Sequence, residues 1–78
     1  MHATVMVTAD NALLGTSESG HQVTMDIAPD LGGQNQGPRP MEMLLLGMGG
    51  CTLIDVIFIL RKSRQAFSGM RVELEAQR

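Results

Sequence analysis

Cys51 is the residue of this 78-residue sequence whose side chain could carry covalent chemistry. A cysteine acts as a nucleophile through its thiolate, which attacks peroxides and disulfides. Cys51 lies about ten residues into an expected helix, too far from the helix N-terminus for the dipole to favour the thiolate. Asp55, one helical turn away, disfavours the thiolate by like-charge repulsion. On the residues alone, Cys51 is therefore a small buried apolar side chain unless a cation reaches it from elsewhere.

Four basic side chains are candidates for that cation, from the same chain or from a partner subunit: Arg39, His21, His2 and Arg71. His21 follows a turn glycine, which is more typical of an exposed histidine at the start of a strand than of an acid or a base. His2 belongs to no pattern that indicates a function. Arg39 is the first arginine of the chain and precedes the expected helix directly.

Glu42 and Asp55 are the carboxylates nearest to Cys51 in the sequence. Glu42 fits the first turn of the helix, where the dipole and unpaired N–H groups favour negative charge; alternatively it pairs with a basic residue across a dimer. Nine helical residues turn through about 900° and rise about 13 Å, so Glu42 and Cys51 lie on opposite sides of a regular helix. Asp55 is either exposed, paired with Arg39 or Arg71, or a negative group that shapes a thiol pocket.

Three short strands and one long helix are expected to position these residues. Weak alternation and turn residues predict strands over 3–8, 13–18 and 22–28, which form an antiparallel meander. Ser19-Gly20 supplies the tight turn between the second and third strands. Residues 29–40 hold all three prolines and three glycines, so this segment is predicted to be a loop.

A helix over residues 41–66 follows Pro40, with Gly69 as its expected stop. Its three glycines cost about 1 kcal/mol each relative to alanine, which the close approach of another backbone would offset. We therefore expect a second helix or a strand to lie against the stripe of Gly47, Gly50 and Ile54. Residues 71–76 alternate again and predict a further C-terminal strand.

The chain has room for one small domain, and its burial energy is close to its conformational entropy cost. One cysteine cannot form a disulfide within the chain, and the seven methionines join no further ligands at metal-binding spacing, so we expect neither a metal nor a cofactor. Self-association is the remaining source of stability. A homodimer or a higher homo-oligomer is therefore expected.

Composition also restricts the partners and the compartment. A net charge of −2 with neither Trp nor Tyr argues against a nucleic-acid partner. The N-terminus has no signal-peptide pattern, and a free thiol suits a reducing cytoplasm. Residues 43–60 carry a single charge, Asp55, so a membrane anchor is an alternative, but three glycines and a central carboxylate weaken insertion and we expect no membrane partner.

The chain resembles the first half of the OsmC/Ohr family, specifically its OsmC-like branch. The resemblance rests on SGHQVTMD, then GG, then GPRPMEMLLLGMGGCTLIDVIFIL, and covers about residues 17 to 75. Its most specific part is P-M-E followed, nine residues after the Glu, by the Cys of G-G-C-T. The resemblance implies an α+β fold with a sheet around a long central helix, an intertwined homodimer, and thiol-dependent reduction of organic hydroperoxides or hydrogen peroxide. It also implies that Cys51 attacks the peroxide and becomes a sulfenic acid.

The sequence departs from the family's pattern at three places. The second cysteine of the family lies in its C-terminal half, beyond this sequence, so a sulfenic acid on Cys51 needs an external thiol or Cys51 of another subunit. The hydroperoxide-resistance branch uses an early-strand arginine, for which Arg39 is the available substitute. The glutamate of that branch falls at Met41, one residue before Glu42.

These features predict that residues 1–78 form a single truncated OsmC-like domain of the α+β class. Its expected function is thiol-dependent peroxide reduction at Cys51, with Arg39 and Glu42 as further candidate site residues. One alternative is a non-catalytic dimerising module whose thiol is buried and inert. A second alternative is a small membrane-associated protein.

Overall fold

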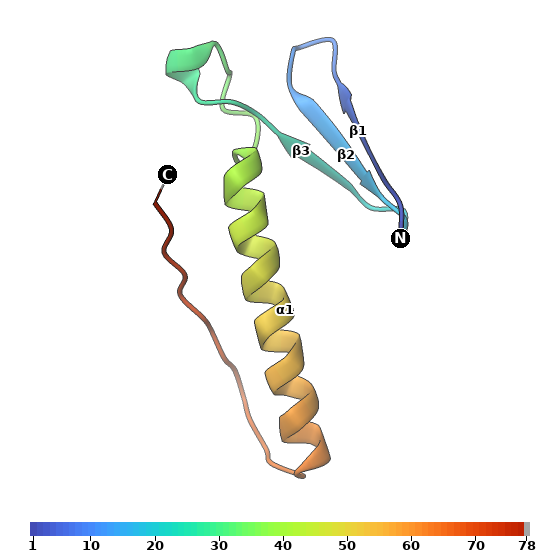
Figure 1. Ribbon diagram of the computed structural model, residues 1–78, viewed down its shortest axis with the longest axis vertical. Helices are drawn as coiled ribbons and strands as arrows, with labels where there is room; N and C mark the ends of the chain where they lie inside the picture. Colours follow the sequence, from blue (N-terminus) through green and yellow to red (C-terminus); the bar gives the residue numbers. More distant parts are fainter. Residues whose placement is uncertain (78) are drawn as a thin grey trace. The chain divides into compact units, whose positions relative to one another are not determined.

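Three β-strands, a short 3-10 helix and one α-helix follow one another in this computed structural model, which describes residues 1–77 (Figure 1). The elements are β1 Ala3–Val7, β2 Leu13–Ser17, β3 Gln22–Met25, η1 Pro29–Leu31 and α1 Pro40–Lys62. The chain divides into two units, Met1–Glu42 and Met43–Arg78, which are described one at a time. Strands followed by a helix confirm the predicted α+β class.

The three strands form an antiparallel sheet in the order β1-β2-β3, as the meander prediction required. Val5 pairs with Gly15, which pairs with Val23, so these three residues lie on one face of the sheet. The turn between β2 and β3 uses Gly20 at φ 91°, where glycine carries no steric penalty. The Ser19-Gly20 turn prediction is therefore confirmed.

β3 ends at Met25, three residues before the predicted end at Ala28. The reason lies in the next residue, because the backbone N–H of Asp26 donates to the carbonyl of Pro38 at 3.0 Å. The loop that leads into α1 thus accepts the hydrogen bond that a neighbouring strand would otherwise accept from Asp26. The strand alternation had placed Asp26 on the polar face beside Thr24, whereas the structure buries it, with 2% of its surface exposed.

α1 begins at Pro40 and ends at Lys62, four residues before the predicted end. Arg64 has a left-handed backbone at φ 55°, and Gln65 N–H donates to the carbonyl of Leu60 at 2.9 Å. This pattern closes a helix with its last carbonyls satisfied, and glycine normally occupies the left-handed position. The predicted stop at Gly69 is wrong because an arginine takes that conformation earlier.

The segment after α1 turns back and runs alongside it, but residues 71–76 form no strand (Figure 1). A strand needs a hydrogen-bonded neighbouring strand, and this segment runs beside a helix instead. A methyl group at Gly49 would lie 2.8 Å from Leu74 Cδ1 and 3.4 Å from Val72 Cγ1. Gly49 is the buried residue of α1, which shows that the close approach occurs there.

The predicted glycine stripe is therefore wrong in position within this chain. A methyl group added at Gly47 or Gly50 would meet no other part of the described chain within 4 Å. A glycine costs a helix about 1 kcal/mol relative to alanine. The close approach of Leu74 explains why Gly49 is a glycine, whereas no contact within residues 1–77 explains Gly47 or Gly50. By length and composition α1 could also cross a membrane, a property that it shares with core helices of soluble proteins.

Candidate functional site

Cys51 lies on the exposed surface of α1, close to the middle of the helix, and is a free thiol. The helix is uninterrupted around it, and the neighbouring Thr52 hydroxyl donates to the carbonyl of Met48 at 3.0 Å. The single chain does not bury this thiol, so a second reactant could reach the sulfur atom. Burial of the thiol by a partner subunit stays a prediction.

The start of α1 is organised by Arg39 and Glu42. Glu42 is in the first turn, and its Oε1 accepts a hydrogen bond from the backbone N–H of Arg39 at 2.8 Å. This is the reach-back half of a capping box, in which an acidic residue at the third helical position pairs with the N–H that precedes the helix. The contact satisfies one polar group at the helix start and engages the carboxylate of Glu42 there.

The guanidinium of Arg39 is held by the loop that leads into α1. Its Nη1 donates to Asn35 Oδ1 at 2.9 Å and to the carbonyl of Gly37 at 3.1 Å. Arg39 is half-buried, and Asn35 adopts a left-handed backbone at φ 55°. Within residues 1–77 both hydrogen bonds of the guanidinium use Nη1, which leaves Nε and Nη2 available to an anionic or polar ligand.

Asp26 is the buried charged residue of the sheet-and-loop unit. Its Oδ1 accepts from the N–H of Ile27 at 2.8 Å, and its Oδ2 accepts from the N–H groups of Gln34 at 3.0 Å and Gln36 at 3.3 Å. One carboxylate thus joins the end of β3 to the far side of the loop. A buried charge is tolerated when it is hydrogen-bonded in this way.

These contacts lower the pKa of Asp26. The hydrogen bond from Gln34 contributes most, the bonds from Gln36 and Ile27 act in the same direction, and the positive charge of Arg39 adds a smaller effect. Burial alone would raise the pKa of a carboxyl group, so the backbone donors outweigh it. Asp26 is consequently ionised at neutral pH.

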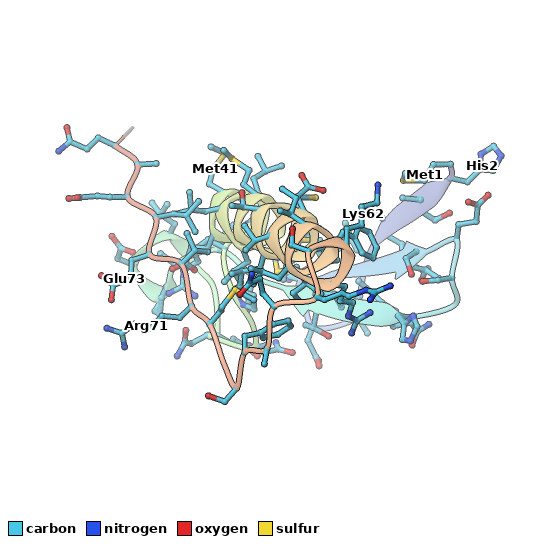
Figure 2. The ribbon with its side chains drawn as sticks, turned by 90° about the horizontal axis from the view of Figure 1, so that it is seen from below. Met1, His2, Met41, Lys62, Arg71 and Glu73 are labelled. Atoms are coloured by element: carbon cyan, nitrogen blue, oxygen red, sulfur yellow. The ribbon has the colours of Figure 1, made fainter. Side chains whose placement is uncertain are left out.

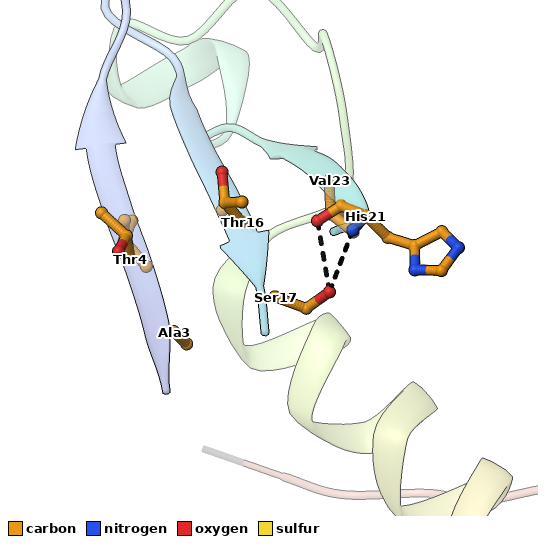
Figure 3. Close-up of a pocket in the computed structure, with 8 residues that line it drawn as sticks. Ala3, Thr4, Thr16, Ser17, His21 and Val23 are labelled. Carbon is orange, nitrogen blue, oxygen red and sulfur yellow. Dashed lines mark hydrogen bonds between the residues drawn. The ribbon is translucent and has the colours of Figure 1, made fainter. Parts of the chain in front are cut away.

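His21 lies at the turn between β2 and β3 and is exposed. Its Nδ1 is 3.0 Å from Ser19 Oγ. Ser17 Oγ accepts from the backbone N–H of His21 at 3.2 Å (Figure 3). A shallow, open hollow of about 180 Å³ lies beside it, lined by Ala3, Thr4, Val5, Gly15, Thr16, Ser17, His21 and Val23. The absent side chain of Gly15 opens this hollow between Val5 and Val23.

The remaining candidates, His2, Asp55 and Arg71, belong to no cluster of candidate site residues among residues 1–77. His2 and Asp55 are exposed. Exposure was one of the alternatives predicted for Asp55. Arg71, its possible partner in another alternative, pairs with Glu73 at 3.0 Å on the C-terminal segment (Figure 2). Within residues 1–77 no three His, Cys, Asp or Glu side chains are grouped as metal ligands.

Sequence reasoning missed Asp26 and Asn35. The available signal was a lone aspartate directly after the alternating Val23 and Met25 and shortly before a loop rich in glycine and amides. Its hydrogen-bond partners are eight and ten residues further along the chain, so no local pattern reveals them.

Comparison with known proteins supports the resemblance read from the sequence. The family model described as OsmC-like protein matches residues 33–78, which include the second part of the loop, α1 and Cys51. The chain is 41% identical over 78 residues to Protein YhfA of Escherichia coli K12 and to Protein YhfA of Shigella flexneri. Each match covers 100% of this chain and 55% of the relative, so the chain spans about half the length of the curated relatives that it matches. The chain therefore belongs to the OsmC-like family.

Proposed function

We propose that the chain carries the peroxide-reducing thiol of an OsmC-like protein and that Cys51 is the residue that reacts. The observation that carries this proposal is the exposed Cys51 on an uninterrupted helix inside the segment matched by the OsmC-like family model. An accessible thiol is required for reaction with a hydroperoxide. The substrate class is organic hydroperoxides, with hydrogen peroxide as the smaller member.

In the first step the Cys51 thiolate attacks the terminal oxygen of the hydroperoxide. An S–O bond forms, the O–O bond breaks, and the alkoxide leaves and takes a proton from water to become the alcohol. Cys51 is oxidised to the sulfenic acid while the peroxide is reduced. An external thiol then condenses with the sulfenic acid and releases water, and a second thiol reduces the mixed disulfide and restores Cys51.

We assign Arg39 of the partner subunit to this chemistry as its cation, since twelve residues at about 1.5 Å each place Arg39 of the same chain about 18 Å from Cys51 along the helix axis. A guanidinium favours the thiolate and can donate to the peroxide oxygens. Its Nε and Nη2 remain available for that purpose while Nη1 is bound to Asn35 and Gly37. Glu42 contributes indirectly, because its carboxylate holds the backbone N–H of Arg39 at the start of α1.

Direct trapping of the sulfenic acid tests the proposal. The protein is treated with an equimolar amount of cumene hydroperoxide in the presence of dimedone and measured by intact mass. We expect one dimedone adduct on the wild-type chain and none on Cys51→Ser, which matches it in size. Cumyl alcohol should appear in the same amount as the adduct. Folded protein that forms no adduct and no alcohol contradicts the proposal.

A second candidate function is a non-catalytic dimerising module, favoured by the apolar side chains that α1 leaves exposed. Leu44, Ile54 and Phe58 are 62%, 52% and 56% exposed. An exposed apolar patch on a soluble protein commonly marks an interaction surface. This candidate predicts self-association without a dimedone adduct, whereas the peroxidase proposal predicts both.

Compartment and solubility form part of the same proposal. A thiol that must be regenerated by external thiols requires a reducing compartment, so we propose that the protein acts in the cytoplasm. The expected outcome is recovery of the chain in the soluble fraction without detergent. Recovery only with membranes would favour the membrane-associated alternative.

A further inference from the structure

One buried carboxylate, that of Asp26, fixes the backbone of the loop over residues 27–38. Asp26 Oδ2 accepts from the N–H groups of Gln34 and Gln36, and its own N–H donates to the carbonyl of Pro38. The loop therefore meets the end of β3 through three hydrogen bonds to one residue. A loop held this way loses the freedom that its glycines and amides would otherwise give it.

The two residues held by Oδ2 flank Asn35. Gln34 and Gln36 each donate to that oxygen, while Asn35 between them adopts the left-handed backbone at φ 55°. Asparagine tolerates this conformation better than most residues do. Asn35 Oδ1 accepts from Arg39 Nη1 at 2.9 Å. The carboxylate of Asp26 thus sets the backbone that aims the amide of Asn35 at the guanidinium.

Gly37 supplies the second acceptor for the same Nη1 atom. Its carbonyl lies 3.1 Å from Nη1, and its Cα packs so tightly on β3 that a side chain would collide with the carbonyl of Thr24. The backbone at Gly37 consequently cannot shift toward β3. Both acceptors of Nη1 therefore belong to the segment that Asp26 attaches to the sheet.

We propose that Asp26 is the positioning residue for Arg39: its buried carboxylate fixes the loop backbone so that Asn35 and Gly37 hold the guanidinium in one orientation. The inference rests on the proposed function in that Arg39 is the cation assigned to Cys51. Asp26 itself touches neither the thiol nor the peroxide in this scheme. It acts through the loop.

The first experiment measures the mobility of the Arg39 side chain in the 78-residue chain. The readout is the heteronuclear NOE of the Arg39 Nε–Hε signal. Asp26→Asn keeps the size of the side chain but replaces one acceptor oxygen by an NH₂ group. We expect Arg39 to be ordered in the wild type and mobile in Asp26→Asn and Asn35→Ala. Asp30→Asn, which makes the same charge change in the same loop, should leave Arg39 ordered. An ordered Arg39 in folded Asp26→Asn overturns the inference.

Acid titration of the wild-type chain keeps the inference testable if Asp26→Asn does not fold. The Arg39 NOE should fall with the same midpoint as the carboxyl carbon signal of Asp26, because protonation weakens the acceptor that holds the N–H groups of Gln34 and Gln36. Among residues 1–77, Arg39 is the charged side chain that acts on this carboxylate. An Arg39 signal that stays ordered through the titration of Asp26 overturns the inference.

The second experiment separates the inference from the proposed function. Arg39→Ala should slow alkylation of Cys51 by iodoacetamide at pH 7 by about three- to tenfold. Asp26→Asn should slow it in the same direction, and the double variant should be no slower than Arg39→Ala, because the effect of Asp26 passes through Arg39. A double variant whose Cys51 is alkylated more slowly than that of Arg39→Ala contradicts that route. If Arg39→Ala changes nothing, the role of Arg39 in the proposed function fails, while the NOE measurement still decides the positioning role.

Discussion

Asp26 and Cys51 have opposite environments in this chain, since the first side chain is buried and the second is exposed. Asp26 is buried with its charge and receives three backbone N–H groups. Cys51 is exposed and has a hydroxyl neighbour that bonds to the helix backbone instead of the sulfur. Asp26 is thus part of the hydrogen-bond network of the fold, whereas Cys51 lies on the surface of α1. This difference suits a structural role for the carboxylate and a reaction with incoming molecules for the thiol.

The ionisation of Asp26 makes stability depend on pH in acid. Its pKa in the folded chain lies below the ordinary aspartate value of about 3.9, so its ionised form adds stability above that pH. This contribution is lost as the pH falls through the lower folded value. We therefore expect the urea midpoint of the wild type to fall as the pH is lowered below about 4.

Asp26→Asn has no carboxyl group to titrate and is the matched variant for this measurement. Its urea midpoint should lie below that of the wild type at pH 6, and the gap should narrow as the pH falls below about 4. A gap that is constant over this range would show that the charge of Asp26 does not contribute to stability.

At the level of the elements, the loop between β3 and α1 depends on a glycine at position 37. Gly37→Ala places a methyl group against the carbonyl of Thr24, a backbone atom that cannot move without moving β3. We expect a loss of about 1–3 kcal/mol in the free energy of unfolding, the usual cost of an overpacked site. Urea denaturation measures it. Gly69→Ala is the control, since a methyl group there meets nothing within 4 Å, and it should change stability by less than about 0.5 kcal/mol.

The contact between the C-terminal segment and α1 depends on the absence of a side chain at Gly49. A larger side chain there would displace Leu74, whose Cδ1 occupies the space 2.8 Å from an added methyl group. We expect Gly49→Leu to abolish the NOE between the Leu74 methyl groups and the helix, and Gly47→Leu to preserve it. Loss of that NOE in both variants would mean that the substitutions disturb the helix rather than the contact.

The elements were more predictable than their ends and contacts. Alternation of Val23 and Met25 and the turn at Gly20 identified β3 correctly, and Pro40 marked the start of α1. The end of α1 was missed because Arg64 adopts a conformation that sequence rules reserve for glycine. The C-terminal segment alternates like a strand, but no local signal shows that its neighbour is a helix. Arg39 and Glu42 were identified as candidates, whereas their link through the helix start came only from the structure.

At the level of the whole molecule, the chain buries little apolar surface of its own. Ala12 is the apolar side chain that is buried among residues 1–77, while Leu46, Ile59 and Leu31 are 63%, 62% and 72% exposed. Hydrophobic burial is the main favourable term in folding, so further cover for these side chains would add stability. A homodimer is the source of cover that we propose.

A homodimer makes the melting temperature depend on protein concentration. If folding and association are coupled, raising the concentration a hundredfold should raise the melting temperature by about 5–10 °C. Gly50→Leu tests whether the glycines of α1 face the partner, because that position is open within the single chain. At a partner interface the larger side chain would keep the chains apart and remove the concentration dependence. On an exposed surface it would instead raise stability by about 1 kcal/mol through helix propensity. A melting temperature independent of concentration in the wild type would contradict the dimer and leave α1 to be covered by other means.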